Sequence, residues 1–228
     1  MPTESVRNKT LHLTPKEISK ISAQAVKLSR KSDLSAVLDR VIWQDAFRAL
    51  SFLPDKCVDL MIVDPPYNLT KNFGQSVFKE MAPADYLKWL DKWLKKTVRI
   101  LKDTASVYIC ADWKSSIPIP YAASKYFVLQ NRISWEREKG RGAKNNWKNC
   151  LEDIWFFTKS NEYLFNLDAV KVLRPVIAPY RDTKGAPKDW FEEKKQKFRL
   201  THPSNIWTDI SVPFWSMAEN TPLSLIHI

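Results

Sequence analysis

The segment Asp64-Pro65-Pro66-Tyr67 (DPPY) has residue types that together could do chemistry. At roughly 5% usage per residue, a given run of four residues occurs by chance in about one such chain in a thousand. The two prolines fix their φ angles and lack N–H groups, so their carbonyls are left free to act as acceptors. Asp64 and the Pro65 carbonyl can therefore accept the two hydrogens of an amine on a planar ring, which would localise the nitrogen lone pair.

Tyr67 adds a flat face on which such a ring can lie. A ring of this kind in a nucleic acid duplex must be swung out of the stack before any enzyme reaches its amine. This chemistry needs no metal and no covalent nucleophile. The competing interpretation is a Pro-Pro turn capped by Asp64. It is less favoured because such a turn needs no tyrosine and usually contains Gly or Asn.

The elements around DPPY predict an α/β fold. Val58–Val63 is an apolar run typical of a central parallel strand, and the segment begins where this strand ends, at the edge where open α/β sheets bind ligands. Leucines recur on one stripe of an expected helix over 84–102. We also expect a strand at Val41–Trp43, a helical turn over 45–53, strands over 106–111, 132–135 and 153–158, and a helix over 119–125. The alternation of strand and helix predicts a mostly parallel sheet with right-handed crossovers.

Composition favours a polyanionic partner. The formal charge is +11, the isoelectric point is about 9.5, and ten tryptophans accompany the basic residues. Three scattered cysteines without ligand spacing indicate a reduced, cytosolic protein, and no apolar run has the length of a membrane span. Thr14, Pro15 and Glu17 predict a capped helix start in a basic arm over residues 1–40.

Together, the run Val58–Asn68, the helix after it and the strands over 106–111, 131–135 and 152–157 resemble the permuted N4/N6 DNA methyltransferase family. The resemblance covers roughly residues 41–222. It implies a three-layer, Rossmann-like α/β fold, S-adenosylmethionine as cofactor, and methyl transfer to an amino group of a flipped base in double-stranded DNA. Aspartate at the first motif position resembles the adenine-N6 members more than the cytosine-N4 members. The implied protein is prokaryotic or from a phage, cytoplasmic and associated with the nucleoid.

The resemblance also assigns residues. It implies that Asp64, Pro65, Pro66 and Tyr67 form the catalytic pocket. Asp45, Ala46 and Asp64 would contact the cofactor, although a helix N-cap is an equally good interpretation of Asp45. The basic loop between the last two expected strands would meet DNA phosphates through Arg137, Lys139, Arg141, Lys144 and Lys148, unless it is only a solvated loop.

The glycine-rich turn that lets a backbone close on S-adenosylmethionine is missing, because none of the four glycines forms one. Residues 223–228 match an in-frame reading of a common sequencing adapter and are expected to be non-native. The expected division is a basic helical arm at 1–40, a catalytic core at 41–159, a target-recognition segment at 160–212 and a truncated segment at 213–228. The fold would then lack its C-terminal strands and expose an apolar sheet edge, and the chain would not methylate DNA.

Other functions stay open at this stage. Methyl transfer to cytosine N4 would use the same arrangement of hydrogen-bond acceptors. A non-catalytic basic DNA-binding module would explain the positive charge without any role for DPPY. The sequence leaves open a homodimer, a companion restriction endonuclease and the recognition sequence.

Overall fold

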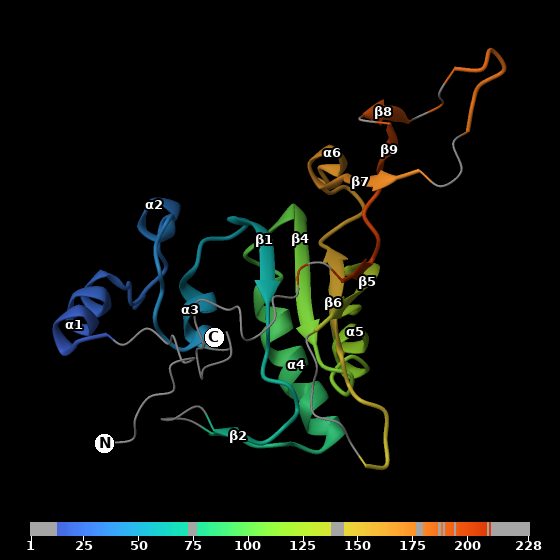
Figure 1. Ribbon diagram of the computed structural model, residues 1–228. Helices are drawn as coiled ribbons and strands as arrows, with labels where there is room; N and C mark the ends of the chain where they lie inside the picture. The colour runs from blue at the N-terminus through green and yellow to red at the C-terminus, as the bar shows by residue number, and fades with distance from the viewer. Residues whose placement is uncertain are drawn as a thin grey trace. The chain divides into compact units, whose positions relative to one another are not determined.

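The computed structural model describes residues 13–72, 77–137, 144–176, 180–186, 188, 190–193, 195–208 and 210 (Figure 1). They belong to two compact units. One runs to Tyr163 and resumes at Ile206, and the other is Leu164–Asn205. The division into four segments that the sequence suggests stays a prediction. In this described part of the chain, no helix has the length and apolar character of a membrane span.

The first unit contains a five-stranded sheet with the order β1-β4-β6-β5-β10. β1 pairs in parallel with β4, and β5 with β10, whereas β6 is antiparallel to both β4 and β5. Four strands therefore run in one direction and one runs against them, which confirms the predicted mostly parallel α/β sheet. The strands are β1 Val58–Val63, β4 Leu101–Ala111, β5 Val128–Glu136, β6 Leu151–Thr158 and β10 Ile206–Trp207.

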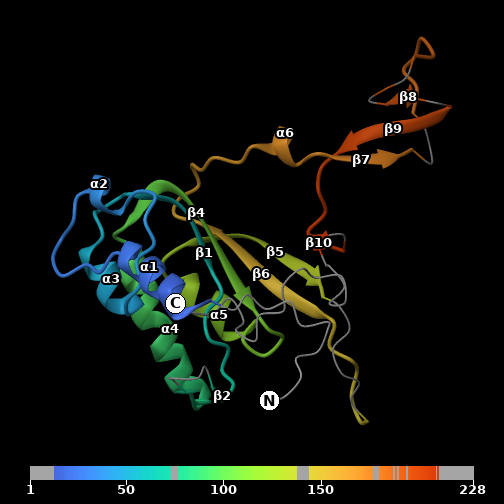
Figure 2. The same cartoon turned by 60° about the vertical axis from the view of Figure 1, so that its left-hand side comes forward.

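Two helices, α4 (Pro83–Thr97) and α5 (Pro118–Ala123), pack on one face of this sheet (Figures 1 and 2). Alternate residues of β4, including Val107 and Ile109, are fully buried under them, while the residues between are only half-buried. On the same less covered face, Leu60 and Ile62 of β1 are 53% and 65% exposed. The described residues thus supply the sheet and one covering layer.

The N-terminal part contains α1 (Pro15–Gln24), α2 (Leu34–Val37) and α3 (Ala46–Phe52). The predicted capping box is confirmed: Glu17 N–H donates to Thr14 Oγ1 at 3.3 Å, and Thr14 N–H donates to the Glu17 carboxylate at 2.8 Å. The predicted strand at Val41–Trp43 is wrong, since Ile42 makes only an isolated bridge to Val26. The segment is held instead by the Gln44 side-chain amide, whose Nε2 donates to the Leu28 carbonyl at 3.3 Å.

Other elements also differ from the sequence analysis. The helix expected to reach residue 102 ends at Thr97, because Leu101 is fully buried as the first residue of β4. The strand expected to begin at residue 132 begins at Val128, and it carries a register shift between Leu129 and Asn131. An unpredicted hairpin joins β2 (Lys71–Asn72) to β3 (Val77–Phe78).

The second unit is a small antiparallel sheet of order β7-β9-β8 preceded by α6 (Leu167–Val170). Its strands are β7 Val172–Pro175, β8 Phe191–Glu193 and β9 Gln196–Thr201. Trp190 is 7% exposed, and its ring N–H donates to the Tyr180 carbonyl at 2.7 Å. Cations of Arg181 and Lys197 lie over the Trp190 ring, at 5.2 and 5.3 Å from its centroid. Among the described residues of this unit, Trp190 is the buried one, and the exposed Arg181 and half-buried Lys197 cover its ring.

Candidate active site

DPPY lies at the carboxyl end of β1. Val63 pairs with Ile109 of β4 and packs against the helical core, so Asp64 follows on the less covered face beside Cys110. Strand alternation places Cys110 and Glu152 of β6 on this same face. Three strand ends therefore bring Asp64, Cys110 and Glu152 together.

Asp64 is a half-buried carboxylate that holds an unused acceptor. Burial raises its pKa, and this rise is opposed by a hydrogen bond from the Tyr67 hydroxyl and by the charges of Lys71 and Arg137. Its Oδ1 atom is buried and receives no hydrogen bond from the described residues. A buried acceptor without a donor is costly in a folded protein, so this oxygen is a candidate contact for a ligand N–H.

Tyr67 serves as a donor to Asp64. Burial raises the pKa of its hydroxyl strongly, and the negative charges of Glu152 and Asp64 raise it further. The hydroxyl therefore stays protonated over the whole physiological range. Its hydrogen bond fixes the Asp64 carboxylate in place.

Tyr86 and Asn68 hold the backbone of the DPPY turn. The Tyr86 hydroxyl, on a side chain only 1% exposed, donates to the Pro66 carbonyl at 2.9 Å. Burial raises the pKa of Tyr86 to about 12, so this donor is also always protonated. Asn68 exchanges two hydrogen bonds of 2.8 Å with the backbone of Met81. The sequence analysis missed both residues, although Tyr86 lies on the buried stripe of α4 with Leu90 and Leu94.

Replacing Tyr86 by Phe removes the hydroxyl and leaves the ring in the core. Because the Pro66 carbonyl then loses its donor, we expect the free energy of unfolding to fall by about 0.5–1.5 kcal/mol. Urea denaturation followed by circular dichroism measures this loss. Tyr121→Phe is the control, since the Tyr121 side chain is 68% exposed and should give no measurable change. Equal effects of the two substitutions would contradict the assigned role of Tyr86.

Glu152 is a second carboxylate at the site, and the sequence analysis missed it. Its side chain is 14% exposed and forms an ion pair with Arg137. Burial raises the pKa of Glu152, Arg137 opposes the rise, and the charges of Asp64 and Asp112 add to it. Burial, Asp64 and Glu152 also raise the pKa of the Cys110 thiol to about 12, so Cys110 is a neutral thiol and not a nucleophile.

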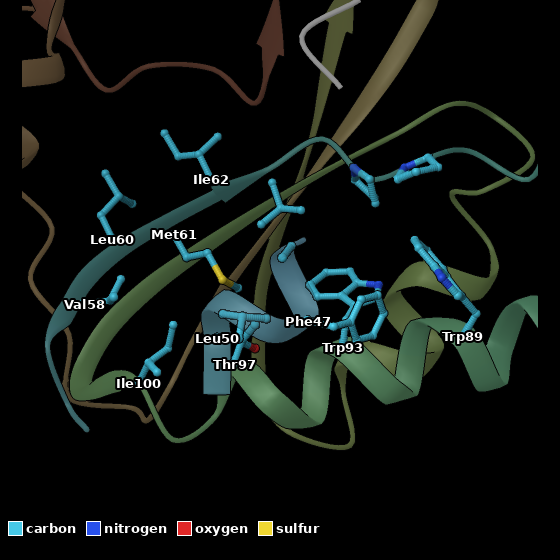
Figure 3. A pocket seen from close by; sticks show the side chains of 14 residues that line it. Phe47, Leu50, Val58, Leu60, Met61, Ile62, Trp89, Trp93, Thr97 and Ile100 are labelled. Carbon is cyan, nitrogen blue, oxygen red and sulfur yellow. The ribbon is translucent and has the colours of Figure 1, made fainter. Parts of the chain in front are cut away.

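The predicted cofactor residues have different roles in the structure. Asp45 caps α3, accepting the Arg48 N–H at 2.9 Å, which is the alternative role that the sequence left open. Ala46 lines a cavity of about 330 Å³ together with Pro65 and Pro66 (Figure 3). Contact of Asp45, Ala46 and Asp64 with a cofactor stays a prediction.

This cavity does not by itself fit S-adenosylmethionine. It follows the edge of β1 between α3 and α4, and Figure 3 shows Phe47, Trp89 and Trp93 along its helical side. Among the described residues that line it, Thr97 alone has a hydroxyl, carboxyl or amide side chain, and the others are apolar or tryptophan. Such a lining suits a flat ring but leaves the ammonium and carboxylate groups of the cofactor without partners. The lining of this cavity therefore does not account for the charged groups of that cofactor.

The five predicted DNA-binding residues differ in where they lie. Arg137 reaches the site, where it pairs with Glu152, and its guanidinium lies 5.9 Å from the centroid of the Trp135 ring. Lys144 and Lys148 are exposed between β5 and β6, and Lys139 and Arg141 lie outside the described residues. Among the residues that the structure describes, no cluster of three His, Cys, Asp or Glu side chains is arranged to hold a metal ion.

Comparison with known proteins gives a consistent result. A family model described as DNA methylase matches residues 58–221. The chain is 28% identical to the Type II methyltransferase M.HpaI of Haemophilus parainfluenzae over 74% of this chain and 49% of that protein. It is 33% identical to the Type II methyltransferase M1.MboII of Moraxella bovis over 64% of this chain and 54% of that protein. It is 29% identical to the DNA adenine methyltransferase YhdJ of Escherichia coli K12 over 73% of this chain and 56% of that protein. The chain thus spans about half the length of these relatives.

Proposed function

The chain belongs to the N6/N4 DNA methylase family, and from this premise we propose that the complete protein is a site-specific DNA methyltransferase acting on adenine N6. Its methyl donor in this proposal is S-adenosylmethionine, and its substrate is a base flipped out of double-stranded DNA. The observation that carries the proposal is the buried Oδ1 of Asp64, which receives no hydrogen bond from the described residues and belongs to the same turn as Pro65 and Tyr67.

The chemistry that these residues perform is activation of an amine. The exocyclic amine of a base is a poor nucleophile because its lone pair is delocalised into the ring. Asp64 Oδ1 and the Pro65 carbonyl accept its two N–H groups and draw the nitrogen towards a localised lone pair. Tyr67 holds the Asp64 carboxylate by its hydroxyl and offers its ring to the base.

The donor contributes an electrophilic methyl group carried on a sulfonium. The residues of this chain that we assign to it are Asp45, Ala46 and Asp64, beside the apolar cavity that Ala46 shares with Pro65 and Pro66. Because this cavity lacks partners for the charged groups of the donor, the remaining contacts must come from residues outside its lining. The part of this chain that aligns with these relatives covers only about half of their length, which is consistent with such a division.

Adenine is favoured over cytosine by two observations. Aspartate stands first in the motif, as in the adenine-N6 members that the sequence resembles. YhdJ, to which the chain is 29% identical, is a DNA adenine methyltransferase. The charge of +11 supports DNA as the partner, with Arg137, Lys139, Arg141, Lys144 and Lys148 proposed at its phosphates. M.HpaI and M1.MboII are Type II methyltransferases, so a companion restriction endonuclease is part of the proposal.

The test is nucleoside mass spectrometry after incubation of the complete protein with S-adenosylmethionine and genomic DNA that lacks methylation. We expect N6-methyladenine to accumulate. N4-methylcytosine without N6-methyladenine would replace adenine by cytosine in the proposal. Binding of DNA without any methylated nucleoside would favour the non-catalytic DNA-binding module.

A further inference from the structure

Resting on the proposed function, we propose that Ser115 is a positioning residue of the acceptor site, because its buried hydroxyl completes a chain of hydrogen bonds that fixes the backbone on both sides of Tyr67. Ser115 lies in the turn after β4, outside DPPY and outside the lining of the cavity beside it. It acts through Tyr67 and does not need to touch the base.

The turn after β4 holds Ser115 in one orientation. Ser115 is only 1% exposed. Its backbone N–H donates to Asp112 Oδ1 at 2.7 Å, and its carbonyl accepts the Ile119 N–H from α5 at 3.1 Å. Because both backbone groups of Ser115 are bonded, the direction of its side chain is set before any ligand binds.

The Ser115 hydroxyl meets the DPPY turn at two points. Its Oγ accepts the Asn68 N–H at 3.4 Å. It is also hydrogen-bonded to the Tyr86 hydroxyl, which itself donates to the Pro66 carbonyl at 2.9 Å. Since the only hydroxyl proton of Tyr86 points to Pro66, Ser115 is the donor in the bond between the two hydroxyls. The bonds therefore form one directed chain from the Asn68 N–H to the Pro66 carbonyl.

The two ends of this chain belong to the peptide groups on either side of Tyr67. The Pro66 carbonyl is in the peptide group before Tyr67, and the Asn68 N–H is in the one after it. Because each peptide group is planar, the φ and ψ angles of Tyr67 alone set how these two groups are oriented to each other. The chain therefore fixes the backbone conformation from which the Tyr67 side chain projects.

Fixing Tyr67 matters because its side chain has two roles in the proposed site. Its ring is the face offered to the base, and its hydroxyl donates to the Asp64 carboxylate. A rotation of the backbone at Tyr67 would displace both groups at once, and small displacements of reacting groups are costly in rate. Because hydrogen bonds in a chain polarise one another, removal of the Ser115 hydroxyl weakens the hold at both ends.

Ser116, the next residue, provides a matched control. It is also buried, at 9% exposed, but its hydroxyl donates to Asp153 and accepts the Trp155 ring N–H at 3.0 Å. Within the described part of the chain, these bonds lead into β6 and away from DPPY. Ser115→Ala and Ser116→Ala therefore remove the same buried group, one from the site and one from the structural network of Asp153.

Backbone amide exchange, measured by NMR on the present chain, tests the link without any activity. We expect the Asn68 N–H to exchange about 10-fold faster in Ser115→Ala, since it loses its acceptor, and to keep the parent rate in Ser116→Ala. The amides of Val107 and Ile109, which are fully buried in β4, report global unfolding and allow a general loss of stability to be subtracted. Equal Asn68 rates in Ser115→Ala and the parent chain would overturn the proposal.

Tyr86→Phe tests whether the bonds act as one chain. The substitution leaves Ser115 and Asn68 unchanged, but it removes the acceptor of the Ser115 hydroxyl, which can then turn away. We expect the Asn68 N–H to exchange faster in this variant as well, by a smaller factor than in Ser115→Ala. An Asn68 rate equal to that of the parent chain would show that the two hydroxyls act separately and would contradict the proposal.

Single-turnover methyl transfer by the complete protein tests the consequence for the site. Ser115→Ala should be about 10-fold slower with unchanged DNA affinity, while Ser116→Ala should match the parent protein. An unchanged rate in Ser115→Ala, or an equal loss in both variants, would refute a positioning role. If the complete protein methylates no DNA, the proposed function fails, and the exchange measurement still decides whether Ser115 holds the backbone at Tyr67.

Discussion

Replacing Asp64 by Ala in the complete protein should lower the rate of methyl transfer by about 10²- to 10³-fold, the usual effect of deleting one hydrogen-bonding group that acts on the transition state. The substitution removes the only carboxylate that directly contacts the amine in the proposed site. Affinity for DNA should change little, because backbone phosphates supply most of it. Single-turnover kinetics and a filter-binding assay measure the two quantities.

We also expect the ionised Asp64 carboxylate to lower the free energy of unfolding of this chain at neutral pH. Burial raises its folded-state pKa, so its ionisation destabilises the fold as the pH rises through that value. Below the unfolded-state pKa of about 3.9 the carboxyl is neutral in both states, and Asp64→Asn should have little effect. At pH 7 the same substitution should raise the free energy of unfolding of this chain.

Urea denaturation at pH 3 and pH 7 measures this difference. Asp59→Asn is the control, because Asp59 is 71% exposed in its pair with Lys102 and should stay within about 0.5 kcal/mol of the parent at both values. A loss of stability in Asp64→Asn at pH 7 would mean that Asp64 is a structural carboxylate, as in the capped Pro-Pro turn.

The largest effect on stability is expected at Asp153, the neighbour of Glu152 that faces the helical side of the sheet. Its side chain is 6% exposed and accepts two hydrogen bonds from Arg132, at 2.8 and 2.9 Å. The Ser116 hydroxyl also donates to Asp153, and the Trp155 ring N–H donates to Ser116 at 3.0 Å. Asp153 therefore links β5, β6 and the start of α5.

Asp153→Ala should lower the free energy of unfolding by about 1.5–3 kcal/mol, because it removes the two charged hydrogen bonds from Arg132 and takes the acceptor from the buried Ser116 hydroxyl. Asp59→Ala, which breaks the exposed pair with Lys102, should cost at most about 1 kcal/mol. Chemical denaturation of both variants gives the comparison. Similar losses would show that the Asp153 network contributes no more than a surface ion pair.

Much of the acceptor site could be predicted from the sequence because its signal is local. An apolar run fixes β1, and DPPY follows it directly, so the position and chemistry of Asp64 follow from one segment. Glu152 could not be found in this way. It lies on the same face of the sheet as Asp64 only because β6 inserts antiparallel between β4 and β5, and the sequence pattern of β6 carries no sign of that direction.

The other features that the sequence analysis did not predict correctly also have physical explanations. In the sequence, Tyr86 is one more large residue on an amphipathic helix. Its role depends on a hydrogen bond to the Pro66 carbonyl, 20 residues earlier in the chain. The strand predicted at Val41–Trp43 has suitable side chains but no neighbouring strand to pair with over more than one residue. Arg137 was predicted to contact phosphates. Its ion pair with Glu152 depends on the pairing of β5 with β6, which the sequence does not show.

The central claim is that the target base lies against Tyr67 beside Asp64, and photo-crosslinking tests it most directly. The recognition sequence is first identified by sequencing DNA methylated by the complete protein. A duplex with 5-iodouracil in place of the target base is then irradiated in complex with the protein, and the crosslinked peptide is sequenced by mass spectrometry. We predict a crosslink to Tyr67 that disappears in Tyr67→Ala. A crosslink that stays on another residue in Tyr67→Ala, with none at Tyr67 in the parent protein, would contradict the proposed site.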